Sequence, residues 1–128
     1  MKLLVEKILS NINRILTGYE KLHHYEEHGC TYAEIKKELV QLKNTSEELT
    51  PLMKSLFKDN PTRIQGITTL SNIFKVTFLP TLKVHLLYLK QTEGLNDSHL
   101  KIQARLAITY LNVDGCIDNL RIIRSYLK

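Results

Sequence analysis

The chain has 128 residues, of which 43% are hydrophobic and 24% charged, with a formal net charge of +5. This length suits a single domain with one hydrophobic core, and the apolar fraction argues against a disordered protein. With two cysteines and five glycines, the chain is neither a disulfide-stapled nor a loop-rich scaffold. We therefore expect one helical-bundle domain that spans residues 1–128.

Two apolar stretches bear on the cellular location. The apolar run at the amino terminus ends at Val5, which is shorter than the roughly 7–15 apolar residues of a secretory signal. The stretch 67–89 is long enough to span a bilayer, but Lys75 and Lys83 would each cost about 3 kcal/mol at its centre. We therefore expect a cytoplasmic protein with no membrane partner, in which both cysteines are reduced thiols.

The first predicted helix ends near Gly29. Apolar residues recur at alternating spacings of three and four from Val5 to Leu22, which is typical of one face of an amphipathic helix. His28 and Gly29 then supply the residue types that usually end a helix. The pattern predicts a long helix that stops at His28.

The second predicted helix begins after Thr31 and contains a proline. Thr31 and Glu34 have the spacing of a capping box, in which each side chain satisfies a backbone amide of the first turn. The apolar stripe keeps its register across Pro51, which favours one kinked helix, with Ser46 as the one polar residue in the stripe. A break near Asn44 with a restart before Pro51 is the alternative.

The remaining sequence predicts two more helices. Asn60 and Pro61 are favourable residues for the start of the third helix, and Pro80 should kink or split it. The fourth begins between Asn96 and Ser98 and continues to the carboxyl terminus as one element. Since connections of about two to five residues force sequential helices to be antiparallel, the predicted fold is all-α. We expect an antiparallel up-down-up-down four-helix bundle whose second and third helices are kinked by proline.

The third and fourth predicted helices are apolar on more than one side. On a helical wheel of the fourth, Ile102, Leu106 and Ile117 belong to one face, and a second apolar face lies nearly opposite. A solitary bundle needs one stripe per helix, so a second face indicates contact with another protein or a second copy of the chain, with a homodimer expected. The alternative is a wider core. The predicted partner-binding residues are Ala104, Ile108, Leu111, Gly115 and Ile122 in the fourth helix, and Ile73, Val76, Val84 and Leu87 in the third.

The distribution of charge supports an alternative function. Residues 1–59 have equal numbers of basic and acidic side chains, so the positive excess lies in the second half of the chain. A basic stripe can neutralise the phosphates of RNA or DNA, although no helix-turn-helix is recognisable. The residues predicted to contact nucleic acid are Lys83, Lys90, Lys101, Arg105, Arg121 and Arg124.

A third hypothesis concerns the bundle end that is rich in histidine and tyrosine. His24 and His28 are four residues apart on one helix and can share a metal ion, with His99 or Cys30 as a ligand from across the bundle end. Both histidines of the pair lie off the apolar stripe, so simple exposure to solvent is the alternative.

Enzyme motifs known on helical bundles are missing from the sequence. A di-iron site on a helical bundle needs two Glu-x-x-His motifs, and the sequence has one, at Glu20 and His23. It contains no His-Glu-x-x-His motif, no glycine-rich phosphate loop and no Cys-x-x-Cys motif. We therefore expect a protein without catalytic activity and without a cofactor or a resident metal. Adaptors, chaperones, immunity proteins and regulators are the classes that this sequence suits.

Overall fold

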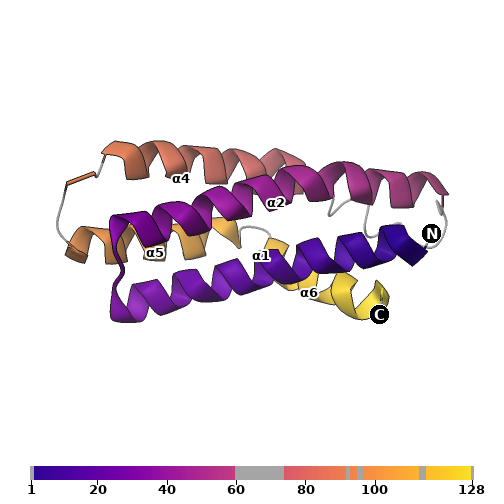
Figure 1. The fold of residues 1–128 in the computed structure, drawn as a ribbon, viewed down its shortest axis with the longest axis horizontal. Coiled ribbons are helices and arrows are strands. Elements are labelled where there is room, and N and C mark those ends of the chain that lie inside the picture. Colours follow the sequence, from indigo (N-terminus) through magenta and orange to yellow (C-terminus); the bar gives the residue numbers. More distant parts are fainter. Residues whose placement is uncertain (1, 60–73, 92, 95–96, 113–114, 128) are drawn as a thin grey trace.

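The computed structural model describes residues 2–59, 74–91, 93–94, 97–112 and 115–127. Within these ranges the chain is almost entirely helical and contains no strand, which confirms the predicted all-α class. The long helices lie side by side along the long axis of the molecule (Figure 1). None of the helices in these ranges is both long and apolar enough to span a membrane.

Helices α1 (Lys2–His28) and α2 (Tyr32–Asp59) form a hairpin. Gly29 has a φ of 85°, a conformation that suits glycine, and its amide donates to the Tyr25 carbonyl at 2.8 Å. The amide of Thr31 donates to Glu34 Oε1 at 2.9 Å, and the amide of Glu34 donates to Thr31 Oγ1 at 3.2 Å. The predicted helix stop and capping box are therefore confirmed, and they fix where the chain reverses direction.

Helix α2 is one continuous helix through Pro51. The predicted single helix is confirmed, and the alternative break near Asn44 is wrong. Hydroxyl groups bond to the backbone on both sides of the proline: Thr50 Oγ1 donates to the Ser46 carbonyl at 3.0 Å, and Ser55 Oγ donates to the Pro51 carbonyl at 3.1 Å. The stripe of apolar residues explains the continuity, because Leu49, Met53 and Leu56 are all buried on the same side.

The third predicted helix is described only from residue 74 onward, and the predicted start at Asn60 and Pro61 lies outside the described residues. A single π-helical turn, η1 (Phe74–Phe78), leads directly into α4 (Leu79–Gln91). Pro80 follows this wide turn at the second position of α4. Because proline has no amide hydrogen and clashes with the preceding turn of a regular helix, a change of helical pitch just before it is the expected response.

The prediction of one continuous fourth helix is wrong. The segment forms two helices, α5 (Asp97–Leu111) and α6 (Cys116–Leu127). The Gly115 amide donates to the Asn112 carbonyl at 3.1 Å, and Gly115 has a φ of 69°. The side-chain Oδ1 of Asn112 accepts from the Ile117 amide at 2.9 Å, as a cap does for a new helix. The pair of Asn112 and Gly115 therefore ends one helix and starts the next.

The hydrophobic core lies between all of these helices. Helix α1 packs against α2, α5 and α6, and α4 packs against α2 and α5. Inside, the Tyr19 hydroxyl donates to the Ile108 carbonyl in the last turn of α5 at 3.0 Å. The cysteines form no disulfide with each other, and Cys116 is buried. The fully buried large side chains include Ile8, Ile12, Ile15, Leu22, Ile35, Leu49, Met53, Phe78, Leu82 and Leu89.

Candidate functional site

Three of the predicted partner-binding residues lie in the core. The exposed fractions of Ala104, Ile108 and Leu111 are 0%, 9% and 1%, so these side chains cannot line an accessible surface. On the other side of α5, Ile102 is 50% exposed although the sequence placed it on the core face. For α5, the inner and outer faces are therefore the reverse of those predicted.

The break at Asn112–Gly115 explains this reversal. A helical wheel assigns faces correctly only if the helix is continuous. The wheel of the fourth predicted helix assigned Ile102 to the same core face as Ile117 and Leu120, which belong to α6. These two are buried, so the assignment is right for α6. Because α5 and α6 are separate helices, a wheel that is right for α6 does not extend to α5, and it is wrong for Ile102 and Ala104.

The other predicted partner-binding residues are at the surface or outside the described residues. Val76, Val84 and Leu87 are 71%, 46% and 64% exposed, and Ile122 on α6 is 61% exposed. Gly115 is half-buried within the break. Ile73 lies outside the described residues. Of the predicted partner-binding residues that the structure describes, three are thus exposed on the third predicted helix and one, Ile122, on the fourth.

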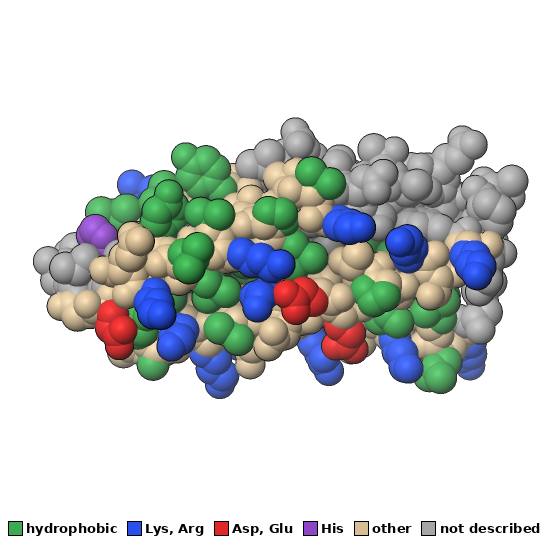
Figure 2. All heavy atoms as spheres, turned by 90° about the horizontal axis from the view of Figure 1, so that it is seen from above, with side chains coloured by type: hydrophobic (Ala, Val, Ile, Leu, Met, Phe, Trp, Pro, Cys, Tyr) green, Lys and Arg blue, Asp and Glu red, His purple; other side chains and the backbone are tan. Residues whose placement is uncertain are grey.

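An apolar surface extends across α4 and α5. We call it the α4–α5 band and define it by Val84, Leu87 and Tyr88 of α4 with Ile102, Leu106 and Tyr110 of α5. All are exposed except Leu106, which is half-buried. The two helices contact each other, and hydrophobic side chains gather over α4 on the face shown in Figure 2. Isolated exposed apolar residues are ordinary, but a continuous group on two neighbouring helices indicates a contact surface.

The sequence prediction missed four residues of the band: Tyr88, Ile102, Leu106 and Tyr110. Tyr88, Ile102 and Tyr110 are each about half exposed. Asn112 and Gly115 were the available signal, because an asparagine followed three residues later by glycine is a typical helix terminator. A wheel restricted to residues 97–111 places Ile102, Leu106 and Tyr110 together on one side.

A buried histidine lies beneath the junction of α4 and α5. His85 is 5% exposed, and its ring centroid lies 6.0 Å from that of Tyr110. Its Nδ1 has no hydrogen-bond partner among the described residues. Burial lowers the pKa of the imidazole below its ordinary value, because desolvation disfavours the charged form. The contact between α4 and α5 therefore buries the neutral form of His85, whose Nδ1 has no hydrogen-bond partner among the described residues.

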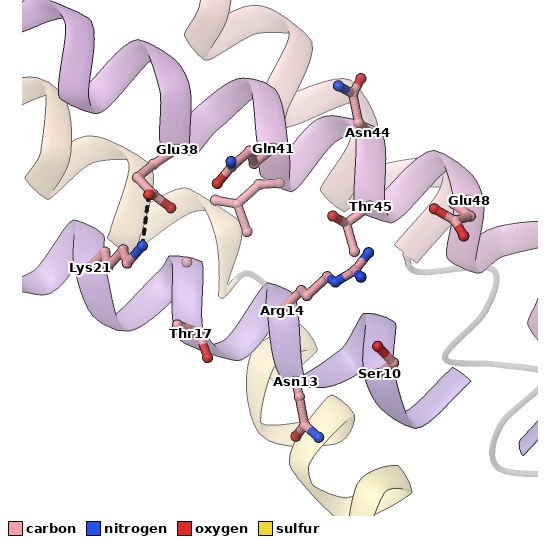
Figure 3. A pocket seen from close by; sticks show the side chains of 12 residues that line it. Ser10, Asn13, Arg14, Thr17, Lys21, Glu38, Gln41, Asn44, Thr45 and Glu48 are labelled. Carbon is pink, nitrogen blue, oxygen red and sulfur yellow. Dashed lines mark hydrogen bonds and ion pairs between the residues drawn. The ribbon is translucent and has the colours of Figure 1, made fainter. Parts of the chain in front are cut away.

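A second candidate site is a polar groove between α1 and α2. The groove has a volume of about 800 Å³, and Figure 3 shows Arg14 reaching from α1 toward Thr45 on α2. Gly18 on α1 faces Leu42 on α2, and an added Cβ would lie 2.9 Å from Leu42 Cδ2. The groove was not predicted from the sequence, although a glycine inside a helical pattern can indicate a packing contact.

The groove is electrically balanced. Lys21 Nζ lies 3.2 Å from Glu38 Oε1, and the Glu38 side chain is only 6% exposed. A nearly buried carboxylate requires such a partner, so this ion pair joins α1 to α2 rather than offering a free charge to a ligand. The other two charged residues that line the groove are Arg14 and Glu48, whose charges are opposite, so the groove has no net charge. The arrangement suits interhelical packing better than selection of a charged ligand.

The six residues predicted to contact nucleic acid differ in whether they already have a polar partner within the chain. Three have polar partners within the chain: Arg105 Nε lies 3.1 Å from Glu26 Oε1, Arg121 NH1 lies 3.1 Å from Asp118 Oδ1, and Arg124 NH1 donates to Asn13 Oδ1 at 3.2 Å. Lys83, Lys90 and Lys101 are exposed and have no ion-pair partner in the described ranges. Within this predicted set, the unpaired positive charges are therefore the three lysines of α4 and α5.

The histidine-rich end has one close pair of rings. The ring centroids of His24 and His28 are 4.6 Å apart at an interplanar angle of 43°, and both residues are exposed. Where the chain is described, no three His, Cys, Asp or Glu side chains come close enough together to hold a metal ion. Neither of the predicted third ligands, His99 and Cys30, therefore lies close enough to His24 and His28 to complete a metal site.

Comparison with protein-family models, with curated proteins and with solved structures finds no match to this chain.

Proposed function

We propose that the chain is a non-catalytic protein-interaction module that binds its partner through the α4–α5 band. The observation that carries this proposal is the exposure of Leu87, Tyr88, Ile102 and Tyr110, each at least half exposed, on two helices that contact each other. Burying a large apolar side chain yields about 1.5–3 kcal/mol, so covering several of them at once provides enough free energy for association. Adaptor, chaperone, immunity and regulatory proteins all work in this way.

We also infer the finer architecture that supports this surface. The short turn at Gly29 and the opposite directions of α1 and α2 support an up-down-up-down bundle in which α4 and α5 form the second antiparallel pair (Figure 1). Pro51 and Pro80 are then the places where the second and third helices bend. In this arrangement the band lies on the outside of the second pair, away from the α1–α2 groove.

Nucleic-acid binding is the second candidate, and exposed Lys83, Lys90 and Lys101 favour it. The arginines support it less, because three of them already have polar partners within the chain. Phosphate contacts also require a basic surface, whereas these lysines border aliphatic side chains. We therefore rank protein binding first, with a metal at His24 and His28 as the third candidate.

The test is a comparison of two surface variants in pull-downs from cells that express the chain. The double variant Leu87→Ser/Ile102→Ser should lose its specific partner, or its self-association in light scattering, because the band loses its central apolar groups. Leu3→Ser, at a residue 65% exposed on α1, is the matched control and should retain binding. Equal recovery of partners by both variants would contradict the proposal.

A further inference from the structure

The α4–α5 band has basic side chains along both long edges. On α4, Lys83 is four residues before Leu87 and Lys90 is three residues after it, so both lie next to Leu87 on the helix surface. On α5, Arg105 is three residues after Ile102, and Lys101 is one turn before Arg105. All four basic residues are exposed. The apolar strip is thus enclosed between two rows of positive charge.

Acidic residues are scarce in this part of the chain. Residues 74–91 contain three lysines and no aspartate or glutamate, in contrast to the balanced first half. Arg105 is paired with Glu26, whereas Lys83, Lys90 and Lys101 have no ion-pair partner within the described ranges. A partner that covers the apolar strip must therefore approach three uncompensated positive charges.

We propose that the occupant of the α4–α5 band is an acidic amphipathic helix of a different protein. Its apolar face would cover Leu87 and Ile102, and carboxylates on its two flanks would meet the lysines at the two edges. A helix laid on the junction of two others is a common mode of peptide recognition, and complementary charge sets its orientation and its rate of association. This inference rests on the proposed function and specifies the chemistry of the partner.

The same charges oppose a second copy of the chain as the occupant. A two-fold symmetric contact would place the band of one copy on the band of the other, because both contribute the same patch. Lys83 and Lys90 on one edge, and Lys101 on the other, would then face basic residues of the second copy. Like charges in such positions are destabilising, so the homodimer expected from the sequence is the weaker choice for this surface.

A bilayer and a nucleic acid also suit the band less well. A bilayer would meet the lysines favourably only where its headgroups are anionic, whereas a protein helix can offer carboxylates to the lysines and polar side chains to the hydroxyls of Tyr88 and Tyr110. A nucleic acid would meet aliphatic Leu87 and Val84 between the two basic rows, where phosphates have no partner. Binding to phosphatidylserine vesicles and to duplex DNA tests these two alternatives.

The experiment uses the full chain and designed peptide probes. The first is a helical peptide of about 18 residues with a leucine stripe flanked on both sides by glutamates. The second has glutamine at every glutamate position, and the third has lysine there. Fluorescence anisotropy measures the Kd of each peptide, and we expect the glutamate peptide to bind at least about tenfold more tightly than the glutamine peptide.

Charge reversal in the protein supplies the specific test. Lys83→Glu/Lys90→Glu should weaken binding of the glutamate peptide by about tenfold or more and should create binding of the lysine peptide. Lys2→Glu/Lys7→Glu on α1 changes the net charge by the same amount and should alter the Kd by no more than about twofold. Circular dichroism checks that both double variants remain helical.

The outcomes separate this inference from the proposed function. If the glutamate and glutamine peptides bind equally and Leu87→Ser/Ile102→Ser removes both, the band binds helices without regard to charge, and only this inference fails. If that variant changes nothing, the proposed function fails as well. Three further results would overturn the inference: tighter binding to phosphatidylserine vesicles than to the glutamate peptide, tighter binding to duplex DNA, or a dimer that Leu87→Ser/Ile102→Ser dissociates.

Discussion

Ser46 is fully buried on α2, and its hydroxyl oxygen has no hydrogen-bond partner among the described residues. A buried hydroxyl without a partner costs about 1–3 kcal/mol relative to one exposed to water. We predict that Ser46→Ala raises the free energy of unfolding by about 1 kcal/mol, as measured by urea denaturation. Ser10→Ala, at an exposed position of α1, is the control and should change it by less than about 0.5 kcal/mol. Destabilisation by Ser46→Ala would show that the hydroxyl is satisfied.

His85 should make the stability of the fold depend on pH. Its pKa is lowered by burial, so below its ordinary pKa of about 6.5 the unfolded chain binds a proton that the folded chain does not. The free energy of unfolding should therefore fall as the pH drops below about 6.5 and continue to fall until the folded-state pKa is passed. His85→Leu should remove this contribution.

The measurement is denaturant unfolding of the wild type and His85→Leu between about pH 5 and pH 8, within the range in which histidine titrates. The difference between the two proteins isolates His85, because the other ionisable groups are common to both. The stability of the wild type relative to the variant should decrease toward low pH. A difference that stays constant with pH would contradict the assignment of His85 as a neutral buried ring.

Residue-level features were predictable where they depend on neighbouring positions in the chain. The reciprocal bonds of Thr31 and Glu34 and the left-handed Gly29 follow from residue type and spacing alone. The burial of Glu38 was not predictable, because it requires Lys21 from another helix. The unpartnered Nδ1 of His85 likewise results from how α4 meets α5.

At the scale of the helices, the contact between α1 and α2 depends on Gly18. A Cβ at this position would lie 2.9 Å from Leu42 Cδ2 and 3.2 Å from Leu42 Cγ, and Leu42 is buried. We predict that Gly18→Ala destabilises the protein, because overpacking costs about 1–3 kcal/mol, whereas the gain in helix propensity is at most about 1 kcal/mol.

A double-mutant cycle tests this prediction. In the background of Leu42→Ala, which removes the obstructing methyl groups, Gly18→Ala should cost nothing or become stabilising, as measured by equilibrium unfolding in urea. The same cost of Gly18→Ala in both backgrounds would show that the helices are not limited by this contact.

The error in the fourth predicted helix shows how a single break affects a functional prediction. The pattern in residues 97–111 alone is sufficient to identify the outer face of α5, and the pattern in 116–127 is sufficient for α6. The error was to combine them, because α5 ends at Leu111 and α6 begins at Cys116, so the two segments do not share one helical wheel. On the third predicted helix, Val84 and Leu87 are exposed and stay candidates, since α4 is continuous around them.

For the molecule as a whole, the band should contribute to binding but not to folding. We predict that Leu87→Ser/Ile102→Ser leaves the free energy of unfolding within about 1 kcal/mol of the wild type, because both side chains are at least half exposed. Leu111→Ser is the matched control from the core of α5, with 1% exposure, and should cost about 3 kcal/mol or more. Urea titration of the three proteins checks both values, and a loss of similar size in the two variants would mean that the band belongs to the core.

The order of the helices along the chain has a kinetic consequence. The α1–α2 hairpin joins residues that are close in sequence, whereas the hydrogen bond from Arg124 to Asn13 joins residues 111 apart. Short loops close more readily than long ones, so the hairpin should form in the folding nucleus and α6 should dock late. Stopped-flow measurements should then show that Thr31→Ala slows folding, whereas Arg124→Ala accelerates unfolding with little effect on the folding rate. On the ribosome, α6 emerges after the other helices described here, and until it docks on α1 the nascent chain has an open flank there where a chaperone can bind.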